Sequence, residues 1–251
     1  MIVFIFLISE MENPYGVPIL HGKLANYFEK CCNFAAVMTK LSSIHPGYKA
    51  ALFDLDGVIC DTEPLYVVFW QGVLSRYYSE TDELIRSNQG QTLVQILDKC
   101  FPGPLESERE KVVRELYAYE AQMDYPYVPG FESFLESLKA DGRTVAVVTS
   151  SNHPKMENVF RAHPALRNGF DAILTSEDFT ESKPSPQCYL RAAERLNLDP
   201  SECIVFEDSV HGLRSGRAAG MFTVALITTN TLDVVAPLSD LQFLDFTTIL
   251  P

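Results

Sequence analysis

The feature that most constrains this chain is a short apolar segment that runs directly into two closely spaced carboxylates. Residues 50–53 are apolar, and Asp54, Leu55, Asp56 and Gly57 follow them. On a β-strand, residues at i and i+2 point to the same side, so Asp54 and Asp56 would face one crevice at the carboxyl end of a strand. Two carboxylates so close together need an offsetting charge, and a hard divalent cation with oxygen ligands can supply it. The alternative is a strand that ends in a solvated acidic turn.

Predicted strands and helices alternate along most of the chain. Apolar, β-rich segments predict strands, and apolar residues at helical spacing predict helices. The predicted strands are 49–55, 144–149, 172–174, 203–206 and 222–227, and the predicted helices are 131–140, 154–162, 186–196 and 210–219. This order predicts an α/β fold with a Rossmann-like, three-layer core, in which helices cover both faces of a parallel sheet.

Between the first strand and the rest of this pattern lies a long stretch with only helical spacing. Residues 63–124 repeat apolar positions every three or four residues, and a Pro-Gly-Pro break divides them at 102–104. We therefore expect a catalytic core formed by residues 48–62 and 128–251, with residues 63–127 inserted as an all-helical cap domain.

Composition limits the class of partner. The 251 residues include 20 basic and 33 acidic side chains, which gives a net charge of −13. An acidic protein repels phosphate backbones, so no nucleic-acid partner is expected. A small phosphorylated substrate remains compatible, because a metal ion and a few local cations can invert the field within one pocket.

Residues 1–47 carry no motif and little periodicity. The apolar run at residues 1–9 is too short to span a bilayer, and no basic segment precedes it as in a signal peptide. We expect a poorly ordered leader or a translation start downstream of Met1, with an interfacial membrane anchor as the alternative. The six cysteines form no CxxC pair, which favours free thiols and a cytoplasmic location, with no membrane partner.

Three later segments place polar side chains where a predicted strand ends or a helix begins. Thr149 ends the second predicted strand, and Ser150, Ser151 and Asn152 follow it. The donors of this run could hold phosphate oxygens, although such a run is also typical of a helix N-cap. Lys183 precedes Pro184 at the entrance to a helix and could act as a point charge toward a phosphate. Finally, Glu207 and Asp208 follow another apolar strand, with Gly212 and the segment Ala218-Ala219-Gly220-Met221 downstream.

These four segments, in this order, resemble the four motifs of the haloacid dehalogenase (HAD) superfamily of hydrolases. The stretch DLDGVICDTEP is similar to the branch that holds β-phosphoglucomutase and sugar-phosphate phosphatases with a helical cap. The resemblance covers about residues 49–227 and implies a phosphoric monoester hydrolase that works through a phosphoaspartate.

The resemblance also implies roles for individual residues. Asp54 would be the nucleophile and Asp56 the general acid and base, while Thr149 and Lys183 would stabilise the transferring phosphoryl group. Ser150, Ser151, Asn152 and, in the cap, Gln91 would bind substrate, with Arg86 as another candidate. Mg²⁺ would be held by a side-chain oxygen of Asp54, the backbone carbonyl of Asp56, and Asp208, with Glu207 either a ligand or a residue that orients a metal-bound water. True dehalogenases of the superfamily lack an acid at the position of Asp56 and use no metal, so Asp56 favours phosphoryl transfer.

Three functions follow as alternatives. The first is a Mg²⁺-dependent phosphatase, expected to be a monomer, that acts on a small sugar or polyol phosphate. The second is a hexose-phosphate mutase of the β-phosphoglucomutase type, but Leu65-Tyr66 stands where that family carries a histidine, and the cap loop at 87–93 lacks its arginine. The third is a catalytically silent binding protein, against which the intact set of motif residues argues.

Overall fold

The centre of the computed structural model, which describes residues 39–251, is a six-stranded parallel sheet. Its order is β4-β3-β2-β5-β6-β7. The strands are β2 (Ala50–Phe53), β3 (Thr144–Val148), β4 (Ala172–Leu174), β5 (Cys203–Glu207), β6 (Phe222–Leu226) and β7 (Leu241–Phe243). This sheet confirms the predicted α/β fold, and β7 is a strand that the sequence analysis did not predict.

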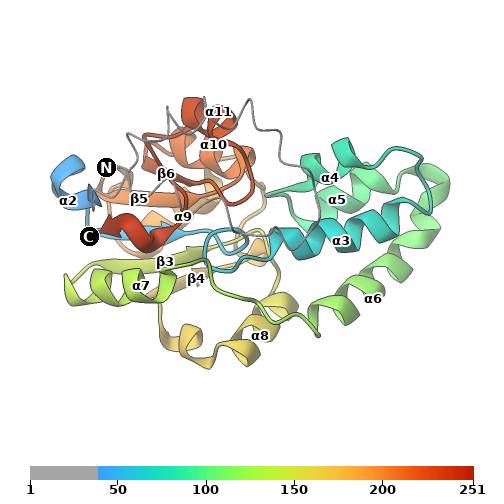
Figure 1. Cartoon of the computed structure of the whole chain (residues 1–251), viewed down its shortest axis with the longest axis horizontal. Coiled ribbons are helices and arrows are strands. Elements are labelled where there is room, and N and C mark those ends of the chain that lie inside the picture. The colour runs from blue at the N-terminus through green and yellow to red at the C-terminus, as the bar shows by residue number, and fades with distance from the viewer. Residues whose placement is uncertain (1–38) are drawn as a thin grey trace, which may run out of the picture. The chain divides into compact units, whose positions relative to one another are not determined.

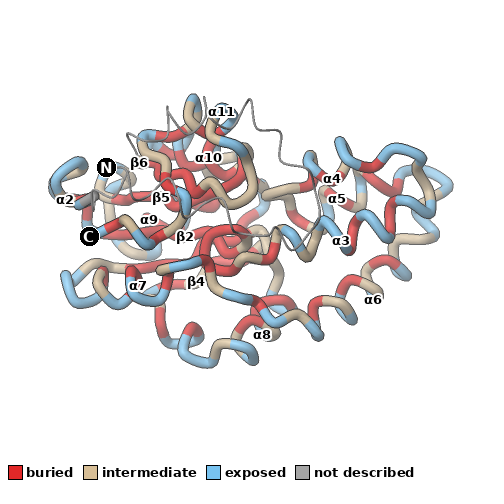
Figure 2. The backbone as a smooth tube through the Cα atoms, viewed as in Figure 1, coloured by how far each residue is buried: buried red, intermediate tan, exposed pale blue. Residues whose placement is uncertain are grey.

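Helices cover both faces of the sheet because alternate residues of each strand point to opposite sides. Ala51 and Phe53 pack with α7 (Phe131–Ala140) and α8 (His153–Ala162), whereas Ala50 and Leu52 pack with α9 (Gln187–Arg195). Helix α10 (Val210–Ala218) packs against β5 and β6, and the short α11 (Leu232–Val235) lies beside it. Figure 2 shows the strands buried and the outer sides of the helices exposed.

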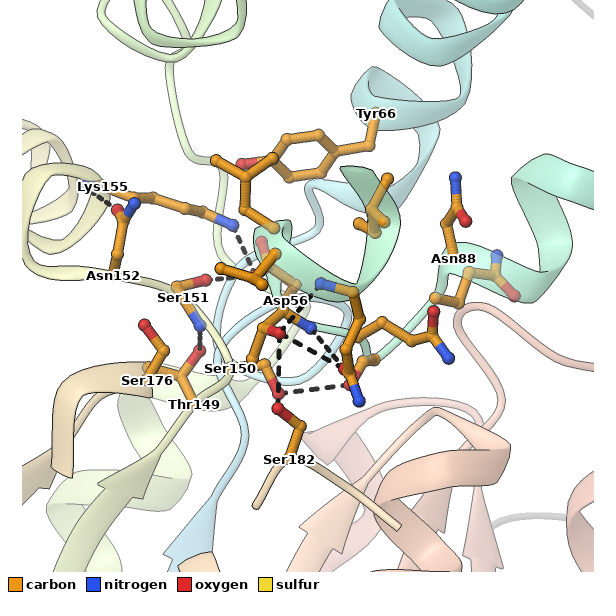
Figure 3. A pocket seen from close by; sticks show the side chains of 18 of the residues that line it. Asp56, Tyr66, Asn88, Thr149, Ser150, Ser151, Asn152, Lys155, Ser176 and Ser182 are labelled. Atoms are coloured by element: carbon orange, nitrogen blue, oxygen red, sulfur yellow. Dashed lines mark hydrogen bonds and ion pairs between the residues drawn. The ribbon is translucent and has the colours of Figure 1, made fainter. Parts of the chain in front are cut away.

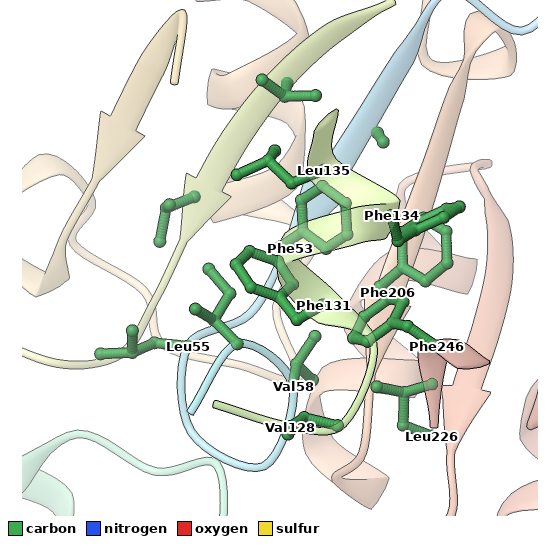
Figure 4. Close-up of a cluster of buried hydrophobic side chains, with 14 of the residues drawn as sticks. Phe53, Leu55, Val58, Val128, Phe131, Phe134, Leu135, Phe206, Leu226 and Phe246 are labelled. Carbon is green, nitrogen blue, oxygen red and sulfur yellow. The ribbon is translucent and has the colours of Figure 1, made fainter. Parts of the chain in front are cut away.

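A cluster of phenylalanines holds the two central strands together. The rings of Phe53 on β2 and Phe206 on β5 stack with centroids 4.8 Å apart, and Phe131, Phe134 and Phe246 pack around them (Figure 4). Each such ring contributes about 1.5–3 kcal/mol by leaving water. Because Phe53 and Phe206 directly precede acidic residues, this packing fixes the positions from which the site is built.

The helices inserted after β2 form a separate layer with a core of its own. They are α3 (Glu63–Leu74), α4 (Asp82–Asn88), α5 (Leu93–Cys100) and α6 (Arg109–Glu120), and they share buried side chains such as Trp70, Leu74, Phe101 and Val112. Figure 1 shows these four helices grouped beyond one end of the sheet. Local sequence sets their limits: Pro64 lies in the first turn of α3, and Thr92 and Gln95 form a capping box at α5.

The two chain segments that join this helical layer to the sheet lie side by side. Asp61 N–H donates to the Pro126 carbonyl at 2.7 Å, and Val128 N–H donates to the Ile59 carbonyl at 3.0 Å. An isolated β-bridge between Cys60 and Tyr127 lies between these bonds. These contacts hold the two connecting segments together where the chain leaves the sheet and returns to it.

Part of the expected leader belongs to the folded chain. Residues 39–47 include β1 (Thr39–Lys40), which pairs with β8 (Ile249–Leu250), and α2 (Leu41–Ile44), whose Leu41 is fully buried. The rest of the leader, residues 1–38, lies outside the described residues, as do Cys31 and Cys32. The four described cysteines are free and buried thiols. Within residues 39–251, no helix has the length and apolar content needed to cross a bilayer.

Candidate active site

Asp54 and Lys183 form the centre of the site. Asp54 directly follows β2, and its backbone N–H donates to the Phe206 carbonyl, so the nearby end of β5 aligns it. Lys183, which precedes α9, is fully buried, and its Nζ lies 2.6 Å from Asp54 Oδ1 and 2.6 Å from Glu207 Oε1. It also donates to the Val148 carbonyl at the end of β3. One lysine therefore links the carboxyl ends of three strands.

Burial governs the electrostatics of this centre. Burial raises the pKa of Asp54 to about 7, although the positive charge of Lys183 works in the opposite direction. For Lys183, burial by itself lowers the pKa, but the carboxylates of Asp54 and Glu207 more than offset it, so its pKa lies well above the ordinary value. Lys183 is therefore a fixed positive charge. Asp54 beside it needs further positive charge to stabilise its ionised form.

Glu207, the last residue of β5, is fully occupied by donors of the protein. Its Oε1 accepts from Lys183 and from the Tyr189 hydroxyl at 2.9 Å, and its Oε2 accepts from Asp208 N–H, Ser209 N–H and Ser209 Oγ at 3.1–3.2 Å. Gly212 on α10 makes room for this carboxylate, because a Cβ there would overlap it. Glu207 thus anchors Lys183.

Asp208 faces a different part of the site from Glu207. Its Oδ2 accepts from the Thr229 hydroxyl, and its backbone carbonyl accepts from Asn230 Nδ2 at 3.0 Å. Gly57, with φ of 73°, allows the loop after β2 to approach so closely that a Cβ would overlap Asp208 Oδ2. Burial, followed by the charge of Glu207, raises the pKa of Asp208 well above its ordinary value.

Together these residues offer an oxygen-rich site for a cation. Asp54, Glu207 and Asp208 can each present a carboxylate oxygen within 4.8 Å of the others, and all three are buried. Oxygen ligands of this kind suit Mg²⁺. Because Glu207 already accepts five hydrogen bonds, the oxygens left without a donor belong to Asp54 and Asp208, and these two fit a metal better than Glu207 does.

Asp56 lies at the side of this cluster and accepts from three side chains. The Thr62 hydroxyl donates to Oδ1, and Ser151 Oγ donates to Oδ2 at 3.0 Å. Lys155 Nζ on α8 lies 2.5 Å from the same Oδ2 (Figure 3). The structure thus places the second carboxylate of the first motif in the site and holds it firmly.

The polar residues 149–152, which follow β3, line the cavity and also cap a helix. Thr149 is buried beside Asp54 in the cavity wall, and its hydroxyl accepts from Ser151 N–H. Ser150 Oγ donates to the Gly90 carbonyl of the cap loop at 3.2 Å. Asn152 caps α8 through Oδ1, while its Nδ2 donates to the Tyr117 hydroxyl on α6. Both interpretations of this run, an N-cap and a site wall, therefore apply.

A cavity of about 810 Å³ opens between the helical cap and these residues. Its walls include Asp54, Asp56, Thr149, Gln91 and Asp208, with Ser150, Ser151 and Asn152 beside them, and Gln91 Oε1 is a buried acceptor without a partner. Arg86 does not line this cavity. It lines a smaller hollow of about 260 Å³ with His211 and Asn230.

Lys155 is the functional residue that the sequence analysis missed. Among the described residues that line the main cavity it is the one cation, and its side chain is buried. A lysine at the second position of an expected helix looks like an ordinary solvated residue. Its ammonium lies over the ring of Tyr66 in the cap, which is distant in sequence, so no local signal could have revealed its burial.

Comparisons with known proteins agree with this geometry. The family model described as haloacid dehalogenase-like hydrolase matches residues 51–226. The chain is 30% identical over 206 residues to validoxylamine A 7'-phosphate phosphatase from Streptomyces hygroscopicus subsp. limoneus, covering 80% of this chain and 96% of that protein. It is also 30% identical over 186 residues to fructose-1-phosphate phosphatase YqaB from Escherichia coli strain K12, covering 70% and 95%.

A solved structure of β-phosphoglucomutase from Clostridium difficile has the same fold. It aligns with a TM-score of 0.68 at 22% identity, covering 79% of this chain and 92% of that one. Because the family model matches residues 51–226, which include the helical cap and most of the strands, the chain belongs to the haloacid dehalogenase-like hydrolases.

Proposed function

We propose that this protein is a Mg²⁺-dependent phosphatase that hydrolyses a small sugar or polyol phosphate through an aspartyl-phosphate. The observation that carries the proposal is the buried contact of Asp54 with Lys183 at the floor of a cavity, with Asp208 and Asp56 beside it. A carboxylate nucleophile splits the hydrolysis of a phosphate ester into two easier steps. Phosphatase activities named for relatives at 30% identity support the same reaction class.

In the first step, a carboxylate oxygen of Asp54 forms a bond to phosphorus, and the bond from phosphorus to the ester oxygen breaks. The electron pair of that bond stays on the leaving oxygen, which takes a proton from Asp56. In the second step, Asp56 accepts a proton from water as the water oxygen attacks phosphorus, which releases inorganic phosphate and regenerates Asp54. Lys183 and the Thr149 hydroxyl would stabilise the charge on the transferring group.

The residues present fit a magnesium ion. We assign Asp54, Asp208 and the backbone carbonyl of Asp56 as its ligands, and Glu207 as the residue that anchors Lys183. The ion would offset the repulsion between the anionic Asp54 and the anionic phosphate. Without it, burial keeps the pKa of Asp54 near 7, which leaves a large part of this nucleophile protonated at neutral pH.

The cavity favours a monophosphate over a bisphosphate. Its cap wall offers amides and hydroxyls such as Asn88, Gln89, Gln91 and Thr92, and Lys155 is its one cation among the described lining residues. A mutase must hold a second phosphate, and Lys155 is already engaged by Asp56. Neutral hydroxyl groups of a sugar or polyol match such a wall. Free thiols on the four described cysteines support the cytoplasm as the compartment.

The test is phosphate release from a panel of phosphate esters, with Mg²⁺ and with EDTA. The panel contains p-nitrophenyl phosphate, fructose 1-phosphate, hexitol phosphates and β-glucose 1-phosphate. We expect release that needs Mg²⁺ and is lost in Asp54→Asn, while Asp233→Asn, an exposed Asp-to-Asn control, keeps full activity. Turnover by Asp54→Asn at the normal rate would refute the proposal. Conversion of β-glucose 1-phosphate to glucose 6-phosphate without phosphate release would indicate the mutase instead.

A further inference from the structure

The structure holds Asp56 in a state in which both of its oxygens are occupied. Thr62 donates to one oxygen, and Ser151 and Lys155 donate to the other. With both oxygens engaged, this carboxylate can turn neither of them toward a substrate without losing a hydrogen bond. If Asp56 exchanges a proton with the leaving oxygen, as in the proposed function, at least one of these donors has to leave first.

Lys155 is the donor that has another acceptor close by. Its Nζ lies 4.4 Å from the centre of the Tyr66 ring, and the Tyr66 hydroxyl donates to Glu120 Oε1 at 2.8 Å. The other oxygen of Glu120, Oε2, has no hydrogen-bond partner, although Glu120 is only 4% exposed. A buried carboxylate oxygen without a donor is costly, by about 1–3 kcal/mol or more.

The charge of Glu120 already acts on Lys155. Burial by itself lowers the pKa of Lys155, but the carboxylates of Asp56 and Glu120 more than offset this, and the pKa is raised. No ion pair joins Lys155 to Glu120 among the described residues, whereas Asp56 lies at ion-pair distance. Lysine has three donors on a flexible four-carbon stem, so it can change partners without a change of backbone.

The two acceptors belong to different layers of the molecule. Asp56 precedes the connection to the cap, and Lys155 lies on α8 of the core, whereas Tyr66 and Glu120 lie on α3 and α6 of the cap. Figure 3 shows the Lys155 ammonium between Asp56 and the Tyr66 ring. A transfer of Lys155 from Asp56 to Glu120 would therefore exchange a contact within the core for a contact between core and cap.

From this arrangement we propose that Lys155 is a positioning residue that moves from Asp56 to Glu120 when substrate binds. In the first position it holds Asp56 as an occupied carboxylate. In the second it satisfies Glu120 Oε2, ties the cap to the core and frees Asp56 Oδ2 to face the leaving oxygen. The Tyr66 ring lies along this path as a cation–π surface and orients Glu120 through its hydroxyl. This proposal rests on the proposed function, because it assigns Asp56 the proton transfer.

The experiment compares two substrates that differ in their need for a proton. The p-nitrophenolate leaving group departs readily without one, whereas the alkoxide of fructose 1-phosphate does not. In Glu120→Gln the cap no longer offers a carboxylate to Lys155, so Asp56 stays occupied. Hydrolysis of the phosphoaspartate also uses Asp56 and is common to both substrates, so the comparison is made in kcat/KM, which ends with the release of the alcohol. Because general acid catalysis contributes about 10²- to 10⁴-fold, we expect kcat/KM for fructose 1-phosphate to fall by about tenfold or more, against less than about threefold for p-nitrophenyl phosphate.

A double variant tests the transfer itself. In Glu120→Gln/Lys155→Met nothing holds Asp56 Oδ2 except Ser151, so kcat/KM for fructose 1-phosphate recovers to within about threefold of the unmodified protein. Glu110→Gln, on the exposed side of the same helix, is the matched control and should change kcat/KM for neither substrate. If Glu120→Gln folds poorly, Glu120→Asp takes its place in the test. It keeps the charge but shortens the reach of the side chain, and should give an intermediate loss.

The outcomes separate this proposal from the function on which it rests. An equal loss of kcat/KM on both substrates in Glu120→Gln, or no recovery of kcat/KM in the double variant, would overturn the role of Lys155. If, in addition, Asp54→Asn retained turnover, the phosphatase mechanism itself would fail. An inactive Asp54→Asn with equal losses in Glu120→Gln would leave the phosphatase in place and remove only the movement of Lys155.

Discussion

Gly212 and Gly72 offer a pair of substitutions with opposite expected signs. Both glycines lie inside helices, where alanine is ordinarily better by about 0.5–1 kcal/mol because it restricts the unfolded chain and has higher helix propensity. A Cβ at Gly72 on α3 meets nothing within 4 Å, whereas a Cβ at Gly212 on α10 would overlap the Glu207 carboxylate. Helix propensity therefore predicts the same gain for both, and packing predicts a loss for one.

The magnitude at Gly212 follows from what Glu207 must give up. To escape the added methyl group, the carboxylate or the helix must move, and both of its oxygens carry short hydrogen bonds, two of them from Lys183 at 2.6 Å and Tyr189 at 2.9 Å. Overpacking costs about 1–3 kcal/mol, and a weakened hydrogen bond to a charged group costs about 1.5–3 kcal/mol. We expect Gly212→Ala to lose about 3 kcal/mol net of the helix gain.

Thermal unfolding of the two variants in EDTA is the assay. For a chain of this size, 1 kcal/mol corresponds to about 2–4 °C in Tm, so Gly212→Ala should melt about 6–12 °C lower and Gly72→Ala about 1–4 °C higher. The phosphatase activity of Gly212→Ala should also fall, because Lys183 loses its anchor. A Tm for Gly212→Ala equal to or above that of Gly72→Ala would refute the assignment of Glu207 as a fixed, fully bonded anchor.

Further predictions concern the charges of the same site. Lys183→Met should lower the Tm of the metal-free protein by about 6–20 °C, because losing one partner of a buried ion pair costs about 3–5 kcal/mol; an unchanged Tm would contradict the buried pair. Mg²⁺ should raise the Tm of the unmodified protein, measured by calorimetry as Mg²⁺ is added. Asp208→Asn should abolish that rise. In EDTA, the free energy of unfolding should fall as the pH rises from 5 to 8. Burial raises the pKa of Asp54 to about 7 and that of Glu63 to about 8, so the folded state binds more protons than the unfolded state in this range. A Tm that rose across these pH values would show that the sign is wrong.

Sequence reasoning could find the residues that follow strands. Asp54 and Thr149 come directly after an apolar segment with strand character, and Asp208 comes one residue after such a segment. The carboxyl ends of parallel strands meet at one edge of a sheet. Alternating strands and helices therefore predicted which distant residues would meet. The two-residue segments β1 and β8 were not predicted, because two residues carry no periodicity that could identify them. The three-residue β7 was also missed: Gln242 interrupts its apolar residues, whereas the equally short β4, which was predicted, is apolar throughout.

The partners supplied by the cap could not be predicted in the same way. The identity of the residue that buries Lys155 depends on how α3 and α6 pack, and their apolar spacing fixes which face is buried but not which core residue meets Tyr66 or Glu120. Arg86 shows the same limit. Its place before the cap loop predicts contact with the substrate, yet in the last turn of α4 it lines the smaller hollow with His211.

The division between Glu207 and Asp208 was within reach of the rule that located Asp54 and Asp56. Adjacent residues at the end of a strand point to opposite sides, so two consecutive acids are unlike two acids at i and i+2. Glu207 accordingly meets Tyr189 and the start of α10, whereas Asp208 meets Thr229 and approaches the Gly57 loop. The consequence is chemical as well as geometric. By accepting from Lys183, Glu207 holds that cation against Asp54, and it leaves Asp208 as the carboxylate of the fourth motif that can face a metal.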